Sequence, residues 1–75
     1  PFVDRLAFHV PDVTGDATVQ LIGLDGRLAL QRYVVLNSAT ASLLDLNGTD
    51  LANGTYLLRV SSAKGTVDQR VVRLK

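Results

Sequence analysis

Apolar residues recur at every second position over much of this chain, which is the spacing of a β-strand with one buried face. In the opening segment, residues 4–10, the large apolar residues Leu6, Phe8 and Val10 alternate with smaller or charged ones. Pro11 follows, and proline ends such a segment because it has no N–H to donate to a neighbouring strand. We therefore predict a first strand here, with its apolar side turned toward a core.

The next part of the chain shows the pattern of a β-hairpin. Two apolar segments, 17–24 and 27–35, flank the pair Asp25-Gly26. This pair is typical of a two-residue type I′ turn, because both central positions of that turn need a positive φ. The alternation then points two leucines of the returning segment inward, Leu28 and Leu30.

The second half of the chain predicts three more strands. They cover residues 39–46, 55–61 and 66–74, and the last two flank a short turn that contains glycine. Residues 47–54 contain two Asn-Gly pairs, which are typical of a loop. The alternation is less regular at 33–35, where we expect a β-bulge or a break in the strand.

Together these segments predict an all-β fold, because no stretch has the spacing of a helix of three turns. Turn residues recur roughly every 8–12 positions, which is typical of a β-sandwich or a small barrel. Apolar residues lie on both sides of several segments, and a single sheet would leave one of its faces unburied. We therefore favour a small β-sandwich of six to seven mostly antiparallel strands.

Composition limits how such a domain is stabilised. The 75 residues fit one domain, and they include no Cys and one His. The chain therefore has no disulfide, and thiolate and multi-histidine metal sites are excluded. Apolar burial and strand pairing must supply the stability, and the hydrophobic content of 47% is compatible with this.

No catalytic centre is recognisable in the sequence. Nucleophilic catalysis needs a base within reach of the nucleophile, but His9 is the only His and lies on the polar side of the first predicted strand. The Asp residues are scattered, mostly in turns, and the acidic segments 12–16 and 45–50 do not match an EF-hand loop. We predict no enzyme activity, no bound metal, no cofactor and no small-molecule substrate.

The charge balance also argues against nucleic acid as a partner. Eight basic and seven acidic residues give a formal net charge of +1, too little to steer the chain toward a polyanion. A nucleic-acid surface would need basic and aromatic residues interleaved on a sheet, and two Tyr and two Phe are too few for this.

Four segments form an ordered set of motifs that covers essentially the whole chain. Residues 1–6 read P-F-x-D-x-L, and residues 19–27 form an apolar strand that ends in Asp-Gly and a basic residue. Residues 51–60 contain L-x-x-G-x-Y followed by an apolar strand, and residues 69–75 form a last strand with basic residues. In this order the set resembles the C-terminal sorting domain of type IX (Por) secretion cargo proteins. Arg73 stands where that family often has Lys.

This resemblance implies a fold and a function. The fold would be an immunoglobulin-like β-sandwich, and residues 1–75 would form a single C-terminal sorting domain, a fragment of a larger secreted protein. The outer-membrane secretion machinery of a Gram-negative bacterium would recognise it after transit through the periplasm. A cell-surface sortase would then remove the domain, so that the cargo is secreted or kept at the cell surface. The domain would be an address label and not an enzyme.

Site candidates are carried over onto the matching motif positions. They are Asp25, Gly26, Gly54, Tyr56, Arg70, Arg73 and Lys75. Gly54 is expected to adopt a φ that other residues avoid, and Tyr56 offers an apolar body with a polar tip at the end of the sandwich. Asp25-Gly26 would set the hairpin register. The three basic residues lie on the last strand, which we expect to be an exposed edge that a protein partner recognises.

Two other functions fit the same pattern. One is a fibronectin-like or carbohydrate-binding module of a secreted hydrolase, for which Tyr33 is the one candidate sugar platform. The other is a structural spacer between domains. Exposed edge strands would also allow two copies of the domain to form a homodimer.

Overall fold

The computed structural model describes residues 4–37, 39–46, 48–49 and 51–74, and none of these is helical. The described chain forms six strands: β1 (Arg5–Phe8), β2 (Gly15–Gly23), β3 (Leu28–Leu36), β4 (Ser42–Asp45), β5 (Gly54–Ser62) and β6 (Gly65–Arg73). The all-β prediction is confirmed. A helix long and apolar enough to cross a membrane is not found in the part of the chain that the structure describes.

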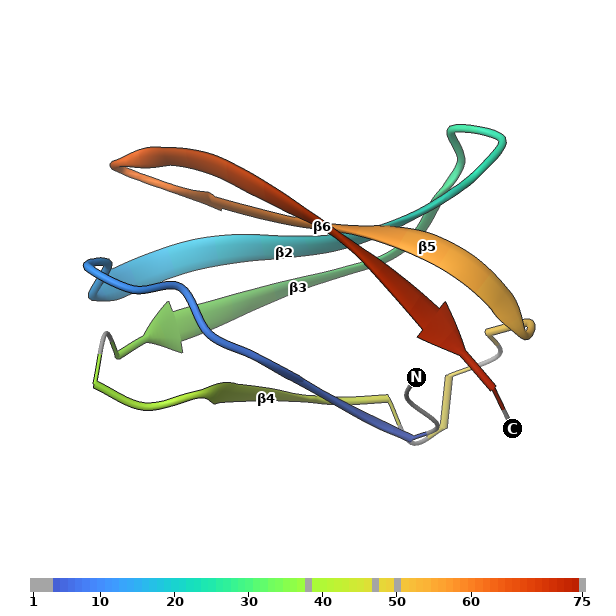
Figure 1. Ribbon diagram of the computed structural model, residues 1–75, viewed down its shortest axis with the longest axis horizontal. Coiled ribbons are helices and arrows are strands. Elements are labelled where there is room, and N and C mark those ends of the chain that lie inside the picture. The colour runs from blue at the N-terminus through green and yellow to red at the C-terminus, as the bar shows by residue number, and fades with distance from the viewer. Residues whose placement is uncertain (1–3, 38, 47, 50, 75) are drawn as a thin grey trace.

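The strands form two antiparallel sheets. The larger sheet has the order β3-β2-β5-β6, and the smaller one pairs β1 with β4. Figure 1 shows β4 running beneath the larger sheet as a separate layer, with β1 in blue. Each sheet hides one face against the other, so the predicted small sandwich is confirmed and the single-sheet alternative is wrong.

The core lies between the two sheets and follows the alternation of the sequence. The apolar side of β1 and of the residues after it is buried, as predicted, and it shares the core with Leu44 of β4 and with Leu46, which follows β4. From the larger sheet Val19, Leu21 and Leu58 are almost fully hidden from solvent. Among the residues that the structure describes, the buried apolar side chains are Leu6, Phe8, Val10, Ala17, Val19, Leu21, Leu36, Leu44, Leu46, Tyr56, Leu58, Val60 and Val71.

The turn between β2 and β3 differs from the predicted two-residue type I′ turn. The Gly26 N–H donates to the Gly23 carbonyl at 3.0 Å, and the Gly23 N–H donates to the Arg27 carbonyl at 2.8 Å. Gly26 has a φ of +85°, but Asp25 is not among the residues with positive φ. The loop therefore has three residues, and only its last position requires the left-handed conformation that favours glycine.

The irregularity of the hairpin lies near this turn and not at 33–35, where we expected it. Leu21 pairs with Leu30 and Ile22 pairs with Leu28, so Ala29 is the extra residue of a β-bulge. Because one extra residue inverts the facing of the residues beyond it, Leu28 shares the outer face with Ile22. It is 53% exposed, so its predicted inward position is wrong, while Leu30 packs against the core.

Candidate recognition surface

Asp25 and Gly26 lie in the exposed β2–β3 turn. The Asp25 carboxylate accepts a hydrogen bond from the Arg27 backbone N–H at 3.0 Å, and the Arg27 guanidinium is 3.7 Å from the same carboxylate. Both side chains are solvent-exposed, and such a pair contributes little to stability. The Asp25 carboxylate thus bridges the turn to Arg27, and Gly26 supplies its positive φ.

Gly54 and Tyr56 begin β5 at the end of the sandwich. Gly54 has a φ of +142°, so the expectation that it adopts a conformation avoided by other residues is confirmed. Tyr56 is buried, and its hydroxyl donates to the Ala52 carbonyl at 2.6 Å. A tyrosine that bonds back to the preceding loop in this way closes the corner of many β-sandwiches. The motif thus ties the loop before β5 to the core.

Arg73 is buried at the end of β6, which differs from its expected place on an exposed edge. Its side chain is on the inner face with Val71, and the residue is 6% exposed. The guanidinium Nη1 donates to the Leu51 carbonyl at 2.6 Å and is 3.5 Å from Oδ1 of Asn53. Nη2 is 4.0 Å from the Asp4 carboxylate. Arg73 therefore joins the last strand to the loop before β5 and to the start of β1.

Arg70 is the exposed basic residue of the last strand. It lies opposite Leu57 on the outer face of the larger sheet, and the residues from Gly65 to Arg70 are all exposed. Lys75 lies outside the described residues. Of the three basic candidates, Arg70 is therefore exposed and Arg73 is buried.

A groove separates β6 from β1. Its volume is about 400 Å³, and its walls are residues 5–7 of β1 and 69–72 of β6. One side of β6 pairs with β5, and β6 is the last strand of its sheet. The groove therefore lies along a strand edge that has no neighbour among the described strands.

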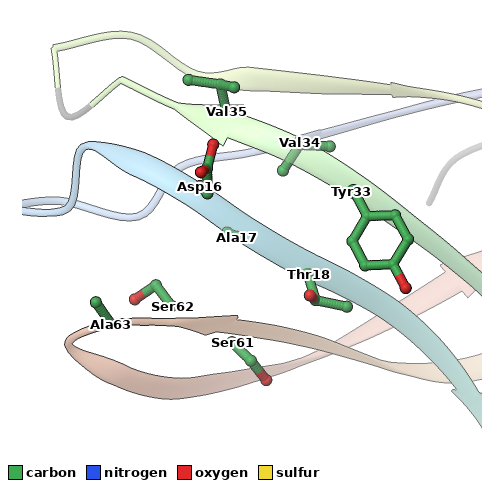
Figure 2. Close-up of a pocket in the computed structure, with 9 residues that line it drawn as sticks. All are labelled: Asp16, Ala17, Thr18, Tyr33, Val34, Val35, Ser61, Ser62 and Ala63. Carbon is green, nitrogen blue, oxygen red and sulfur yellow. The ribbon is translucent and has the colours of Figure 1, made fainter.

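A second hollow lies on the outer face of the larger sheet. Figure 2 shows its side chains, which come from β2, β3 and the β5–β6 hairpin, and its volume is about 570 Å³. Tyr33 is 78% exposed at its rim, opposite Thr18, and Asp16 is its one charged side chain. The Tyr33 hydroxyl accepts a hydrogen bond from Gln31 at 2.9 Å. This hollow is open and presents one aromatic ring beside hydroxyl groups.

The outer face also carries an ion pair across β5 and β6. Arg59 Nε and Nη2 are 2.9 Å and 3.2 Å from the two carboxylate oxygens of Asp68. These hydrogen bonds, and the attraction of the opposite charges, lower the pKa of Asp68 and raise that of Arg59, and desolvation opposes both effects. The Asp68 charge is thus matched within the domain.

The described residues contain no group of three or more His, Asp or Glu side chains that could hold a metal ion. The site that emerges is instead a strand edge with basic residues beside it. Our sequence reasoning missed Arg5, which lines the same groove as Arg70 from the opposite sheet. It also missed the partners of Arg73, although the two-residue spacing from Val71 was a signal that Arg73 shares the inner face.

The family model described as the secretion system C-terminal sorting domain matches residues 1–74. Neither the curated proteins nor the solved structures contain a significant match to this chain.

Proposed function

This chain belongs to the family of secretion system C-terminal sorting domains, and from that premise we propose how it directs a cargo through type IX secretion. Membership establishes a C-terminal sorting signal, carried by a secreted or cell-surface protein, and this is not an enzyme family. In our proposal residues 1–75 are a single domain of a larger cargo protein. The cargo transits the periplasm and crosses the outer membrane, and a cell-surface sortase then removes the domain.

The observation that carries the proposal is the division of β6 into a displayed part and a buried part. Residues 65–70 are exposed along an edge, while Val71 and Arg73 anchor the end of the same strand. An exposed edge offers unpaired backbone groups to another protein. We assign recognition by the secretion machinery to this edge, with Arg70 as its exposed basic residue and Lys75 continuing the motif.

The other candidates act by holding this surface in place. Gly54 and Tyr56 fix the loop to which Arg73 bonds. Asp25 and Gly26 shape the β2–β3 turn, and Gly26 lines one hollow together with Tyr56 and Arg70. In this proposal they are positioning residues, and Arg73 is one as well. Substituting them should reduce secretion only as far as it reduces folding.

A reporter fusion tests the proposed function. Residues 1–75, with their native upstream segment, are placed after a reporter in a host competent for type IX secretion. We expect the reporter in the medium or on the cell surface, and sortase action would leave it without the domain. Deletion of residues 71–75 should leave it in the periplasm. A periplasmic reporter with the intact domain would contradict the proposal.

Pairing of two copies is a further part of the proposal. Both β3 and β6 are terminal strands of the larger sheet, and either edge would allow a second copy to continue it. Sedimentation velocity over a range of concentrations measures this directly. A single monomeric species at every concentration would contradict the homodimer.

The outer hollow favours a second candidate function, that of a carbohydrate-binding module. An exposed tyrosine beside Thr18, Ser61 and Asp16 (Figure 2) combines an apolar ring with hydrogen-bonding groups, the mixture on which a sugar ring would rest. If this function holds, Tyr33→Ala abolishes retention on an immobilised polysaccharide and leaves the fold intact. Absence of retention for the unaltered chain would leave only the sorting function.

A further inference from the structure

The groove between β1 and β6 has the form of a site for an added strand. It is bounded by strands of different sheets, with residues 5–7 on one side and 69–72 on the other. We propose that this groove binds an extended, acidic segment of a partner protein, which pairs with the free edge of β6 while its carboxylates meet Arg5 and Arg70. This inference rests on the proposed function, since the partner would belong to the secretion machinery.

The backbone of β6 supplies the first argument. Because β6 ends its sheet, the N–H and C=O groups on its far side have no partner strand in the described part of the chain. An extended peptide can satisfy such groups by continuing the sheet, and the hydrogen bonds supply affinity without requiring a particular sequence. Specificity must then come from the side chains beside the strand.

The groove is shaped for alternating side chains. Leu6 and Val71 belong to the buried core and supply apolar lining, and Gln69 adds an exposed polar side chain from β6. Successive side chains of a strand point to opposite sides. An incoming strand would therefore place one set of side chains toward the apolar lining and the other set toward solvent and the groove rims.

Charge supplies the argument for an acidic partner. Arg5 and Arg70 both line the groove and are both exposed, one from each sheet, and neither has an ion-pair partner among the described residues. The exposed Arg59, by contrast, is paired with Asp68. Guanidinium groups bind carboxylates through paired hydrogen bonds. Arg5 and Arg70, which line the groove from the two sheets, thus favour a segment with carboxylates.

One end of the groove is tied by the contact between Asp4 and Arg73, which joins the start of β1 to the end of β6. Toward the other end the inner face of β6 is uncovered, and Val67 is 50% exposed there. An added strand would therefore enter from the side of the β5–β6 turn and cover Val67. This gives a second measurable consequence, since Val67 should lose solvent exposure in the complex.

The binding test uses a designed peptide and the whole 75-residue chain. The probe is a nonapeptide in which valine alternates with glutamate, with acetylated and amidated ends, titrated into ¹⁵N-labelled protein. We expect shifts confined to residues 5–8 and 65–73, and an affinity at least roughly tenfold above that of the same peptide with lysine for glutamate. Replacing two of the valines by proline should abolish binding, because proline cannot complete the ladder.

Several outcomes of this titration would overturn the inference. Equal binding of the glutamate and lysine peptides would remove the role of Arg5 and Arg70. Shifts centred on β3 or on the hollow of Figure 2 would place the site elsewhere. Pairing of two copies through β6, detected as a dimer that the peptide does not dissociate, would make a second copy the occupant. No binding of any peptide would also overturn it.

Secretion of the reporter fusion separates this inference from the proposed function. The double variant Arg5→Glu with Arg70→Glu should lower export at least roughly tenfold, because the two guanidinium–carboxylate contacts become repulsive. The matched control is Arg27→Glu with Arg32→Glu, which changes the net charge equally on the exposed β2–β3 hairpin. Equal export of the two double variants would overturn the inference and leave the sorting function standing. Failure of the unaltered domain to export its reporter would instead refute the sorting function.

Discussion

The two parts of β6 differ in how far they are exposed to solvent. The residues from Gly65 to Arg70 are all exposed, whereas Val71 and Arg73 are buried. Both parts pair with β5 in one continuous register, so strand pairing does not distinguish them. What differs is the layer beneath, because the smaller sheet covers the end of β6 and leaves its beginning open.

Two valines show that a residue of β6 is buried only where the smaller sheet packs against the strand. Val67 and Val71 share the inner face of β6, but Val67 is 50% exposed and Val71 is 9% exposed. Arg70 and Arg73 show the same division among basic residues. The residue type alone therefore does not show whether a basic residue of this last strand stabilises the domain or binds a partner. The substitutions below measure the contribution of each residue to stability.

Removing the Arg73 guanidinium should have the largest effect. Arg73→Met keeps most of the apolar stem but leaves the Leu51 carbonyl without its donor, so we expect a loss of about 3 kcal/mol in the free energy of unfolding. Such a loss is a large fraction of the stability of a domain of this size. Urea denaturation followed by circular dichroism measures it.

Arg70→Met is the matched control. Its side chain is exposed and has no ion-pair partner among the described residues, so the free energy of unfolding should change by less than about 0.5 kcal/mol. Equal losses for the two variants would show that the buried and displayed parts of β6 do not differ energetically.

The valine pair should give the next largest difference. Val71→Ala removes two methyl groups from the core and leaves a cavity, and we expect it to cost about 2 kcal/mol. Val67→Ala removes the same groups from a half-exposed site and should cost well under about 1 kcal/mol. Chemical denaturation of both variants measures the difference, and a Val67 effect as large as that of Val71 would indicate that the start of β6 is covered in solution.

The tyrosines extend the comparison to hydroxyl groups. Tyr56→Phe removes the part-buried hydrogen bond to the loop before β5 and should cost about 1 kcal/mol. Tyr33→Phe removes a hydrogen bond to Gln31 on an exposed face, where water can replace it, and should change stability by less than about 0.5 kcal/mol. Thermal unfolding of the two variants, at one pH and salt concentration, checks the order.

The sequence predicted the core faces well because alternation is a local property. Leu6, Phe8 and Val10 are buried as expected, since two-residue spacing alone places them on one side. Leu28 failed because a single extra residue, Ala29, lies between it and the rest of β3. Nothing in the local alternation marks a bulge at an alanine, so the facing could not be counted across it.

The candidate site was predictable only in part. The unusual φ of Gly54 and the place of Tyr56 at the end of the sandwich were predicted correctly, because these properties depend on the residues themselves. Arg5 was not predicted to line a groove, because this requires that β1 lie beside β6. These two strands are the first and the last along the sequence. Which sheet packs over a strand depends on the topology of the fold, and the alternation of apolar residues along the sequence does not reveal it.

The smallest expected effect concerns the ion pair on the exposed part of the last strand. The hydrogen bonds from Arg59 hold the pKa of Asp68 below its value in the unfolded chain, about 3.9, with charge attraction acting in the same direction. Because the folded state then binds the proton less readily, the contribution to stability is present above about pH 4 and is lost as the pH falls through the folded-state pKa. Asp68→Asn should remove this dependence, and since both side chains are partly exposed, the effect should also shrink in high salt.

Urea denaturation of both proteins between about pH 2 and pH 5 measures this acid dependence. The unaltered chain should lose slightly more stability toward acid than Asp68→Asn, and the two curves should converge at low pH. A difference as large as that of Arg73→Met would mean that this pair is shielded from water, and the beginning of β6 would then no longer count as an open edge. Identical curves would mean that the Arg59–Asp68 pair does not contribute to stability. The exposed part of β6 would then be held in place by its pairing with β5 and not by this ion pair.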